Sequence, residues 1–339
     1  FTMTDFSRAE ILTPNIFDHR TVMVDVYYPT LWNESAPSRF KDSIPTCDFI
    51  NVYIQPIEFA TSRYSCEDPI RSKATVMAPI VKTAEGFPLV LYHASLFGDR
   101  NENTFIAENL VKQGYIVAAI SNTYMDQNVY INGMYKIVHN PGFDLNDPEL
   151  IVKALEYLEG RAEVAVEDTK FVIEKLKQYN GFHFLNAINV DKIGHFGFSL
   201  GGGIATLALQ RLDEIDAAVN FDGPNHGDVL VNGLEKPWMM IYADQFFHQM
   251  VMDFIWPTLP TGITFTVNNS KHYNYSDMCQ GDLVSSRDGA CGDIDALHMN
   301  NLLNDYTIAF FNKYLKGIDS DILTSPSSKY PEIDNFHSK

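Results

Sequence analysis

The sequence predicts an α/β fold in which helices cover both faces of a mostly parallel central sheet. Residues 115–120 form a continuous apolar run, which is typical of a parallel strand buried on both faces. Such runs alternate with helical segments along the chain, and this order implies right-handed crossovers. The chain has 339 residues, 45% of them hydrophobic, which suits one large core. Because no internal repeat or linker divides it, we expect residues 1–339 to form a single domain.

The expected elements follow from β-branched and aromatic runs, from helical periodicity and from glycine or proline stops. Strands are predicted at residues 20–29, with a hairpin partner before it, and at 87–92, 115–120, 190–196, 217–223, 237–244 and 263–267. Helices are predicted at residues 103–113, 148–159, 160–179, 202–209 and 293–316. The long polar segment 31–75 is expected to be an irregular insertion near the mouth of the site. The Ser/Pro-rich tail 322–339 is expected to be mobile.

Composition excludes several classes of partner. The net charge is −18, with 43 acidic and 25 basic residues, and we find no basic stripe. Nucleic-acid binding depends on clustered Lys and Arg, so a nucleic-acid partner is not expected. No apolar run is long enough to predict a transmembrane segment. The composition does not indicate an oligomeric state.

The four cysteines fall into two local pairs, and each pair lies in a predicted loop. They lack the close paired spacing of a zinc site, and no metal is expected. An even count in loops favours disulfides, which we predict as Cys47–Cys66 and Cys279–Cys291. Disulfides indicate an oxidising compartment.

Three sequons are compatible with that compartment. Candidate N-glycosylation sites are Asn33, Asn268 and Asn274. The sequence begins at Phe1, as a processed chain would. Together with the cysteines, these features lead us to expect a secreted, extracellular protein.

The central motif is Gly197-x-Ser199-x-Gly201, the pattern of a nucleophile elbow. A predicted strand precedes it and a helix rich in small residues follows it. The two glycines leave room for a sharp strand-to-helix turn that exposes the serine hydroxyl. The N–H of Leu200 then lies at a helix N-terminus, where it is a candidate oxyanion donor.

A serine nucleophile needs a base and an acid that orients the base. In the α/β-hydrolase order, the acid and then the histidine follow the serine along the chain. His272 follows the last predicted strand before the final helix and is the candidate base. Two acids end suitable strands, Asp222 and Asp244, and position alone does not separate them.

The chain resembles the platelet-activating-factor acetylhydrolase family of serine α/β-hydrolases, of the plasma or type II kind, over about residues 20–316. The resemblance is carried by residues 24–29, 88–92 with the loop that follows, 114–120, the elbow, 221–223 and 272–277. It implies the α/β-hydrolase fold and His272 as the base, and it favours Asp222 over Asp244 as the acid. It also implies a second oxyanion amide after residues 88–92, at Leu96 or a neighbour.

These residues predict a serine esterase that hydrolyses carboxylic esters through a Ser-His-Asp triad and an acyl-enzyme, without cofactors. The expected substrate is a small-molecule or lipid ester, either a short-acyl phospholipid, as the resemblance implies, or a general carboxylic ester. A polyester or aryl-ester hydrolase with cutinase-like activity is the alternative. A catalytically silent α/β-hydrolase used for binding and a peptidase or amidase also remain open.

Overall fold

The computed structural model describes residues 1–13, 15–31, 74, 77–96, 98–125, 129–131, 134–136, 148–243, 245–279 and 289–339. Within these residues, nine strands form one sheet in the order β1-β2-β4-β3-β7-β8-β9-β10-β11. The strands are β1 (Thr2–Ala9), β2 (His19–Tyr27), β3 (Phe87–His93), β4 (Ile116–Asn122), β7 (Ile188–Phe198), β8 (Ala217–Phe221), β9 (Trp238–Tyr242), β10 (Gly262–Val267) and β11 (Ile333–Ser338). The consecutive strands from β4 to β10 are parallel, whereas β1, β2 and β11 are antiparallel to their neighbours.

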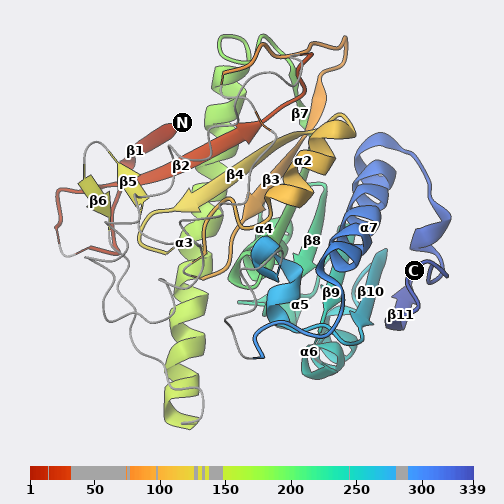
Figure 1. The fold of residues 1–339 in the computed structure, drawn as a ribbon. Coiled ribbons are helices and arrows are strands. Elements are labelled where there is room, and N and C mark those ends of the chain that lie inside the picture. Colours follow the sequence, from red (N-terminus) through yellow and green to blue (C-terminus); the bar gives the residue numbers. More distant parts are fainter. Residues whose placement is uncertain are drawn as a thin grey trace.

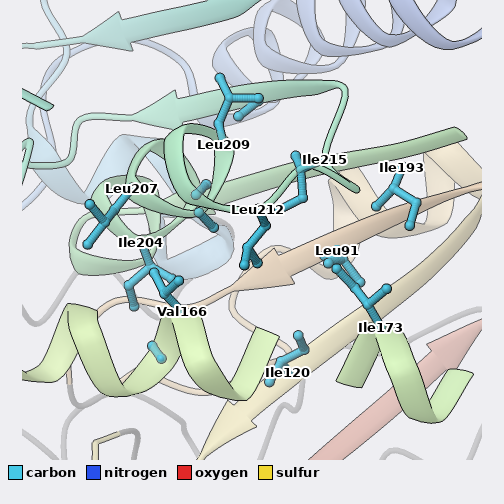
Figure 2. Close-up of a cluster of buried hydrophobic side chains, with 14 of the residues drawn as sticks. Leu91, Ile120, Val166, Ile173, Ile193, Ile204, Leu207, Leu209, Leu212 and Ile215 are labelled. Atoms are coloured by element: carbon cyan, nitrogen blue, oxygen red, sulfur yellow. The ribbon is translucent and has the colours of Figure 1, made fainter. Parts of the chain in front are cut away.

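Helices cover both faces of this sheet (Figure 1). Successive side chains of β3 show why, because Leu89 and Leu91 pack into one cluster and Val90 and Tyr92 into the other. The first cluster lies under α3 (Pro148–Asn180) and α4 (Leu200–Arg211), and the second under α2 (Thr104–Lys112) and α7 (Ala296–Lys316). Figure 2 shows Leu91 of the first cluster beside Ile173 of α3. The predicted mostly parallel α/β architecture is confirmed.

Shorter elements follow the strands. They are a β-hairpin of β5 (Val129–Ile131) and β6 (Met134–Lys136), α5 (Val229–Asn232), α6 (Gln245–Met250), a π-helical turn (Val251–Ile255) and 3₁₀ turns at His272–Tyr275, Asp277–Cys279 and Asp321–Leu323. No strand was predicted from the sequence where the β5–β6 hairpin lies.

One long helix replaces two predicted ones. Helix α3 runs unbroken through Gly160, where we expected a boundary between residues 148–159 and 160–179. A Cβ at Gly160 would meet nothing within 4 Å, so the residue lies on an open side of the helix. An interior glycine costs only about 1 kcal/mol relative to alanine. The burial of Ala162, Ala165 and Val172 against the sheet outweighs that cost.

The tail was also predicted wrongly, because residues Ile333–Ser338 form β11 where we expected a mobile segment. This strand pairs antiparallel with β10 and covers its open edge. Phe336 stacks on Phe265 of β10 with ring centroids 5.7 Å apart. The short run that follows the Ser/Pro-rich residues forms a strand because the edge of β10 is available for pairing.

The predicted Cys279–Cys291 disulfide is present, with its Cα atoms 6.0 Å apart. Cys47, Cys66 and Asn33 lie outside the described residues, as does most of the predicted insertion 31–75. Among the helices that are described, none is both long and apolar enough to cross a membrane.

Two sequons lie within the described chain. Asn268 is exposed at the end of β10. Asn274 is only 2% exposed, and its Oδ1 accepts hydrogen bonds from the backbone N–H groups of Lys271 and Gly292. A glycan needs an accessible side chain, so the burial of Asn274 argues against this candidate in the folded protein.

Candidate active site

Ser199 lies at the sharp turn between β7 and α4. Its backbone has φ 56° and ψ −125°, a conformation that non-glycine residues rarely adopt. A Cβ on Gly197 would lie 2.1 Å from the carbonyl oxygen of Gly201. A Cβ on Gly201 would lie 2.0 Å from the carbonyl oxygen of His93. Both glycines of the motif are therefore required by close backbone approach, and Ser199 is held at the tip of the turn.

Asp222 follows β8 and is 3% exposed. Its φ is 50°, and its N–H donates to the carbonyl oxygen of Ile241 in the neighbouring strand β9. The N–H of Ala243 donates to its Oδ1 at 2.9 Å. The carboxylate is therefore oriented by the backbone N–H of the residue that directly follows β9, and a backbone donor leaves no sequence signal.

His272 begins the 3₁₀ turn that follows β10, and it connects the other two residues. Its Nδ1 lies 2.5 Å from Oδ2 of Asp222, and its Nε2 lies 3.0 Å from Oγ of Ser199. The ring packs against Phe198 with centroids 4.8 Å apart, while 42% of the side chain stays exposed. Three residues from three loops, separated by up to 73 positions, thus form one chain of hydrogen bonds.

The two predicted oxyanion donors lie on opposite sides of the elbow in sequence. Leu200 is the first residue of α4, where backbone N–H groups have no intrahelical acceptor. Leu96 lies in the turn after β3, and its side chain packs on the core beneath α3 and α4. The roles of both amides remain predictions.

Four other described histidines make contacts of their own. His93 and His195 are both buried and are joined by a 2.8 Å contact between Nδ1 and Nε2. Burial lowers the pKa of His93 to about 4 and the pKa of His195 well below its usual value, so both rings are neutral. His226 packs beside Gly203 of α4, and burial lowers its pKa to about 4. His298 pairs with Glu332 at 2.7 Å.

Asp244, the alternative acid, lies outside the described residues. Phe198 and Trp238 are fully buried, so neither offers exposed aromatic surface to an aryl ester. The Nε1–H of Trp238 donates to Thr206. In the part of the chain that is described, no group of three or more His, Cys, Asp or Glu side chains has the geometry to hold a metal ion.

Two curated proteins are similar to this chain over most of its length. The sequence is 26% identical over 271 residues to a probable 1-alkyl-2-acetylglycerophosphocholine esterase from Arthroderma benhamiae, covering 73% of this chain and 66% of the relative. It is 25% identical over 276 residues to a platelet-activating factor acetylhydrolase from Bos taurus, covering 71% of this chain and 60% of the relative. The matched part of the chain spans less than two thirds of the length of these curated relatives. The names of the relatives confirm the resemblance to the platelet-activating-factor acetylhydrolase family that the motifs indicated.

A solved structure shares the whole fold. A ferulic acid esterase from Streptomyces cinnamoneus superposes with a TM-score of 0.78 at 22% identity, covering 98% of this chain and 94% of the other. The predicted α/β-hydrolase fold is confirmed. The sequence model of the dienelactone hydrolase family matches residues 76–252, more than half of the 339 residues, and the chain belongs to that family.

Proposed function

We propose that the protein is a serine esterase that hydrolyses carboxylic esters through Ser199, His272 and Asp222. The hydrogen-bond chain from Asp222 through His272 to Ser199 carries this proposal. The strained backbone of Ser199 at the start of α4 supports it, because strain of this kind is found at functional sites. The family and the names of the relatives support the same reaction class.

In the first half of the reaction, Oγ of Ser199 attacks the ester carbonyl and Nε2 of His272 takes its proton. The imidazolium that forms donates from Nδ1 to Asp222, which stabilises the cation. The N–H groups of Leu200 and Leu96 bind the oxyanion, and each such donor contributes about 3 kcal/mol in comparable sites. The carbonyl re-forms as the alcohol leaves, and His272 gives this alcohol the proton.

In the second half, a water molecule attacks the acyl-enzyme. His272 accepts one proton of this water, and the oxygen forms the new bond to the acyl carbon. Collapse of the second tetrahedral intermediate breaks the bond to Ser199, which recovers its proton from His272. The products are a carboxylic acid and free enzyme, and the cycle needs no external oxidant or reductant.

A short-acyl glycerophospholipid is the proposed substrate class, with general carboxylic esters as the wider range. The support comes from the names of the two curated relatives, one an acetylglycerophosphocholine esterase and the other a platelet-activating factor acetylhydrolase. Because Phe198 and Trp238 are fully buried, they cannot bind the aromatic group of a polyester or an aryl ester, which weakens that alternative.

The Ser199→Ala variant tests the reaction class. We expect wild-type protein to hydrolyse p-nitrophenyl acetate and to be labelled by a fluorophosphonate, and we expect the variant to do neither while keeping its circular dichroism spectrum. Equal turnover by the variant would exclude Ser199 as the nucleophile. An unlabelled, inactive wild-type protein would instead favour the silent binding protein.

A substrate panel tests the substrate class. Purified protein is given acetyl and palmitoyl glycerophosphocholines, p-nitrophenyl esters of two to sixteen carbons, a feruloyl ester, a soluble polyester and a peptide anilide. We expect the acetyl phospholipid to have the highest kcat/KM. Preference for the polyester or the feruloyl ester would replace the phospholipid proposal, and cleavage of the anilide alone would indicate an amidase.

We also propose that the protein acts in an oxidising, extracellular compartment. The Cys279–Cys291 disulfide and the exposed sequon at Asn268 support this location. Expression with a secretion signal in a eukaryotic host tests it. Mass spectrometry should find the disulfide and a glycan on Asn268, and it should find no glycan on Asn274. A predominantly reduced Cys279 in the secreted protein would contradict the proposal.

A further inference from the structure

A buried glutamate holds the turn that follows β3. Glu102 precedes α2 and is 2% exposed. Its Oε2 accepts the backbone N–H of Ser95 at 3.0 Å, and its Oε1 accepts the hydroxyl of Ser95 at 3.0 Å. Ser95 is itself 5% exposed. Both oxygens of the buried Glu102 carboxylate thus accept hydrogen bonds from Ser95, which restricts the backbone of this residue.

The turn closes tightly around this contact. The N–H of Gly98 donates to the carbonyl oxygen of Ser95 at 2.8 Å. A Cβ on Gly98 would lie 2.4 Å from Oε2 of Glu102 and 2.5 Å from Oγ of Ser95. The chain therefore wraps directly onto the carboxylate. Leu96 lies between these two fixed residues, and its N–H belongs to the peptide group that begins at Ser95.

The same short segment also holds the loop of His272. The N–H of Asp277 donates to the carbonyl oxygen of Glu102 at 2.8 Å, and Oδ2 of Asp277 accepts the N–H of Phe105 at 3.1 Å. Nδ2 of Asn103 donates to the carbonyl oxygen of Tyr275 at 2.9 Å. Residues 102–105 thus hold two loops at once, one with the candidate oxyanion amide and one with the candidate base.

We propose that Glu102 is a positioning residue, which sets the Leu96 N–H at the distance from Ser199 that the oxyanion requires. The proposal rests on the esterase function proposed above. Glu102 acts through Ser95 and need not touch the substrate. An oxyanion donor acts in the transition state more than in the bound substrate, so a displaced donor lowers kcat and leaves KM nearly unchanged. A displacement of about 1 Å can reduce the rate about 100-fold.

Three substitutions separate the geometry of Glu102 from its charge. Glu102→Ala removes both acceptors, and Glu102→Asp keeps the charge but shortens the side chain by one methylene. Glu102→Gln keeps the length, because its carbonyl accepts the Ser95 N–H and its amide donates to the Ser95 hydroxyl. We expect kcat on p-nitrophenyl acetate to fall about 10- to 100-fold for Ala and Asp, and less than about threefold for Gln.

The affinity for a transition-state analogue distinguishes a positioning role from a purely structural one, because a purely structural role would leave this affinity unchanged. Oγ of Ser199 adds to the carbonyl carbon of a trifluoromethyl ketone, and the ketone oxygen becomes an oxyanion. The inhibition constant should therefore rise by the same factor by which kcat/KM falls. KM should stay within about twofold of wild type. Glu174→Ala, at an exposed glutamate of α3, is the matched control and should keep wild-type values.

Two results would overturn the positioning role. One is unchanged kcat in both Glu102→Ala and Glu102→Asp, and the other is a Gln variant as impaired as the Ala variant. If Glu102→Ala does not fold, Glu102→Asp alone decides, and a kcat equal to wild type there also overturns the role. These results leave the esterase function intact as long as wild-type protein hydrolyses the ester. If wild-type protein is inactive, both proposals fall.

Discussion

Ala243 donates its backbone N–H to Oδ1 of Asp222 at 2.9 Å, while Oδ2 of the same carboxylate lies 2.5 Å from Nδ1 of His272. Ala243 directly follows β9, and Asp222 directly follows β8, its parallel neighbour. The acid is therefore held between a donor from the next strand and the imidazole. Both of its oxygens must accept a hydrogen bond.

The Asp222→Asn variant should lose most activity for this reason. An amide has one acceptor oxygen, so its NH₂ group would face either the Ala243 N–H or the Nδ1–H of His272. We expect kcat to fall about 10³- to 10⁴-fold, as when the wrong histidine tautomer is favoured in other triads. Steady-state kinetics measure it, with Asp244→Asn as the control. A larger loss in the control would reassign the acid to Asp244.

Asp277 should make stability depend on pH. Burial raises its pKa to about 8, and the carboxylates of Glu102 and Glu108 add to the effect. An acid with a raised folded pKa contributes stability that is complete below its unfolded pKa, about 4, and is lost as pH rises to its folded pKa. Between these limits the loss is at most about 1.4 kcal/mol per pH unit.

The Asp277→Asn variant isolates that contribution, because the amide oxygen can still accept the Phe105 N–H. Urea unfolding at several pH values should show wild type losing stability relative to this variant between about pH 4 and pH 8. Parallel stability curves for the two proteins across this range would contradict the assigned shift.

The buried ion pair between Asp168 and Arg20 should be essential to stability. Asp168 is fully buried, and its oxygens accept from Arg20 at 2.6 Å and from Arg8 at 2.7 Å. Although burial opposes it, the adjacent guanidinium groups hold the pKa of Asp168 below its usual value. In Asp168→Ala, Arg20 would keep its contact with Glu10, but its buried Nε and Nη2 groups would lose their acceptor. This variant should therefore lower the free energy of unfolding by about 3–5 kcal/mol.

The control is an exposed pair. Glu163 pairs with Arg211, and both side chains are more than a third exposed. Because solvent screens such pairs, Glu163→Ala should change the free energy of unfolding by less than about 1 kcal/mol. Thermal or urea denaturation of both variants measures the difference, and equal losses would refute the special role of the buried pair.

The Cys279–Cys291 disulfide should stabilise the loop that follows His272. The bond closes a separation of 12 residues, and Cys279 ends the turn that contains Asp277. We expect Cys279→Ser to lower the free energy of unfolding by about 2–3 kcal/mol. The double variant with Cys291→Ser should lose no more than the single variant, since the bond is lost only once. Additive losses in calorimetry would show that the two sulfurs act separately.

Sequence patterns named the three residues that the structure joins by hydrogen bonds, but they did not predict the strand at the edge of the sheet. Ser199 and His272 were identified because the elbow motif and the chain order are local signals, and the structure brings both residues together with Asp222. The separation of Asp222 from Asp244 rested on resemblance, because both residues end apolar strands. Strand β11 was missed, since six residues of mixed polarity form a strand only when the edge of β10 is available. Gly160 led us to predict a helix boundary that does not exist, because the burial of neighbouring residues of α3 outweighs the small cost of one interior glycine.

The amino-acid sequence by itself determined the alternation of strands and helices, the nucleophile motif and the order of serine, acid and base. These features depend on side-chain type and spacing, which are written in the chain. Only the tertiary structure decided which backbone groups hold the candidate catalytic residues: Ala243 for Asp222, and the segment of Glu102 for the loops of Leu96 and His272. Backbone N–H groups are the same in every residue but proline, so their partners follow from the packing of the sheet and leave no pattern in sequence.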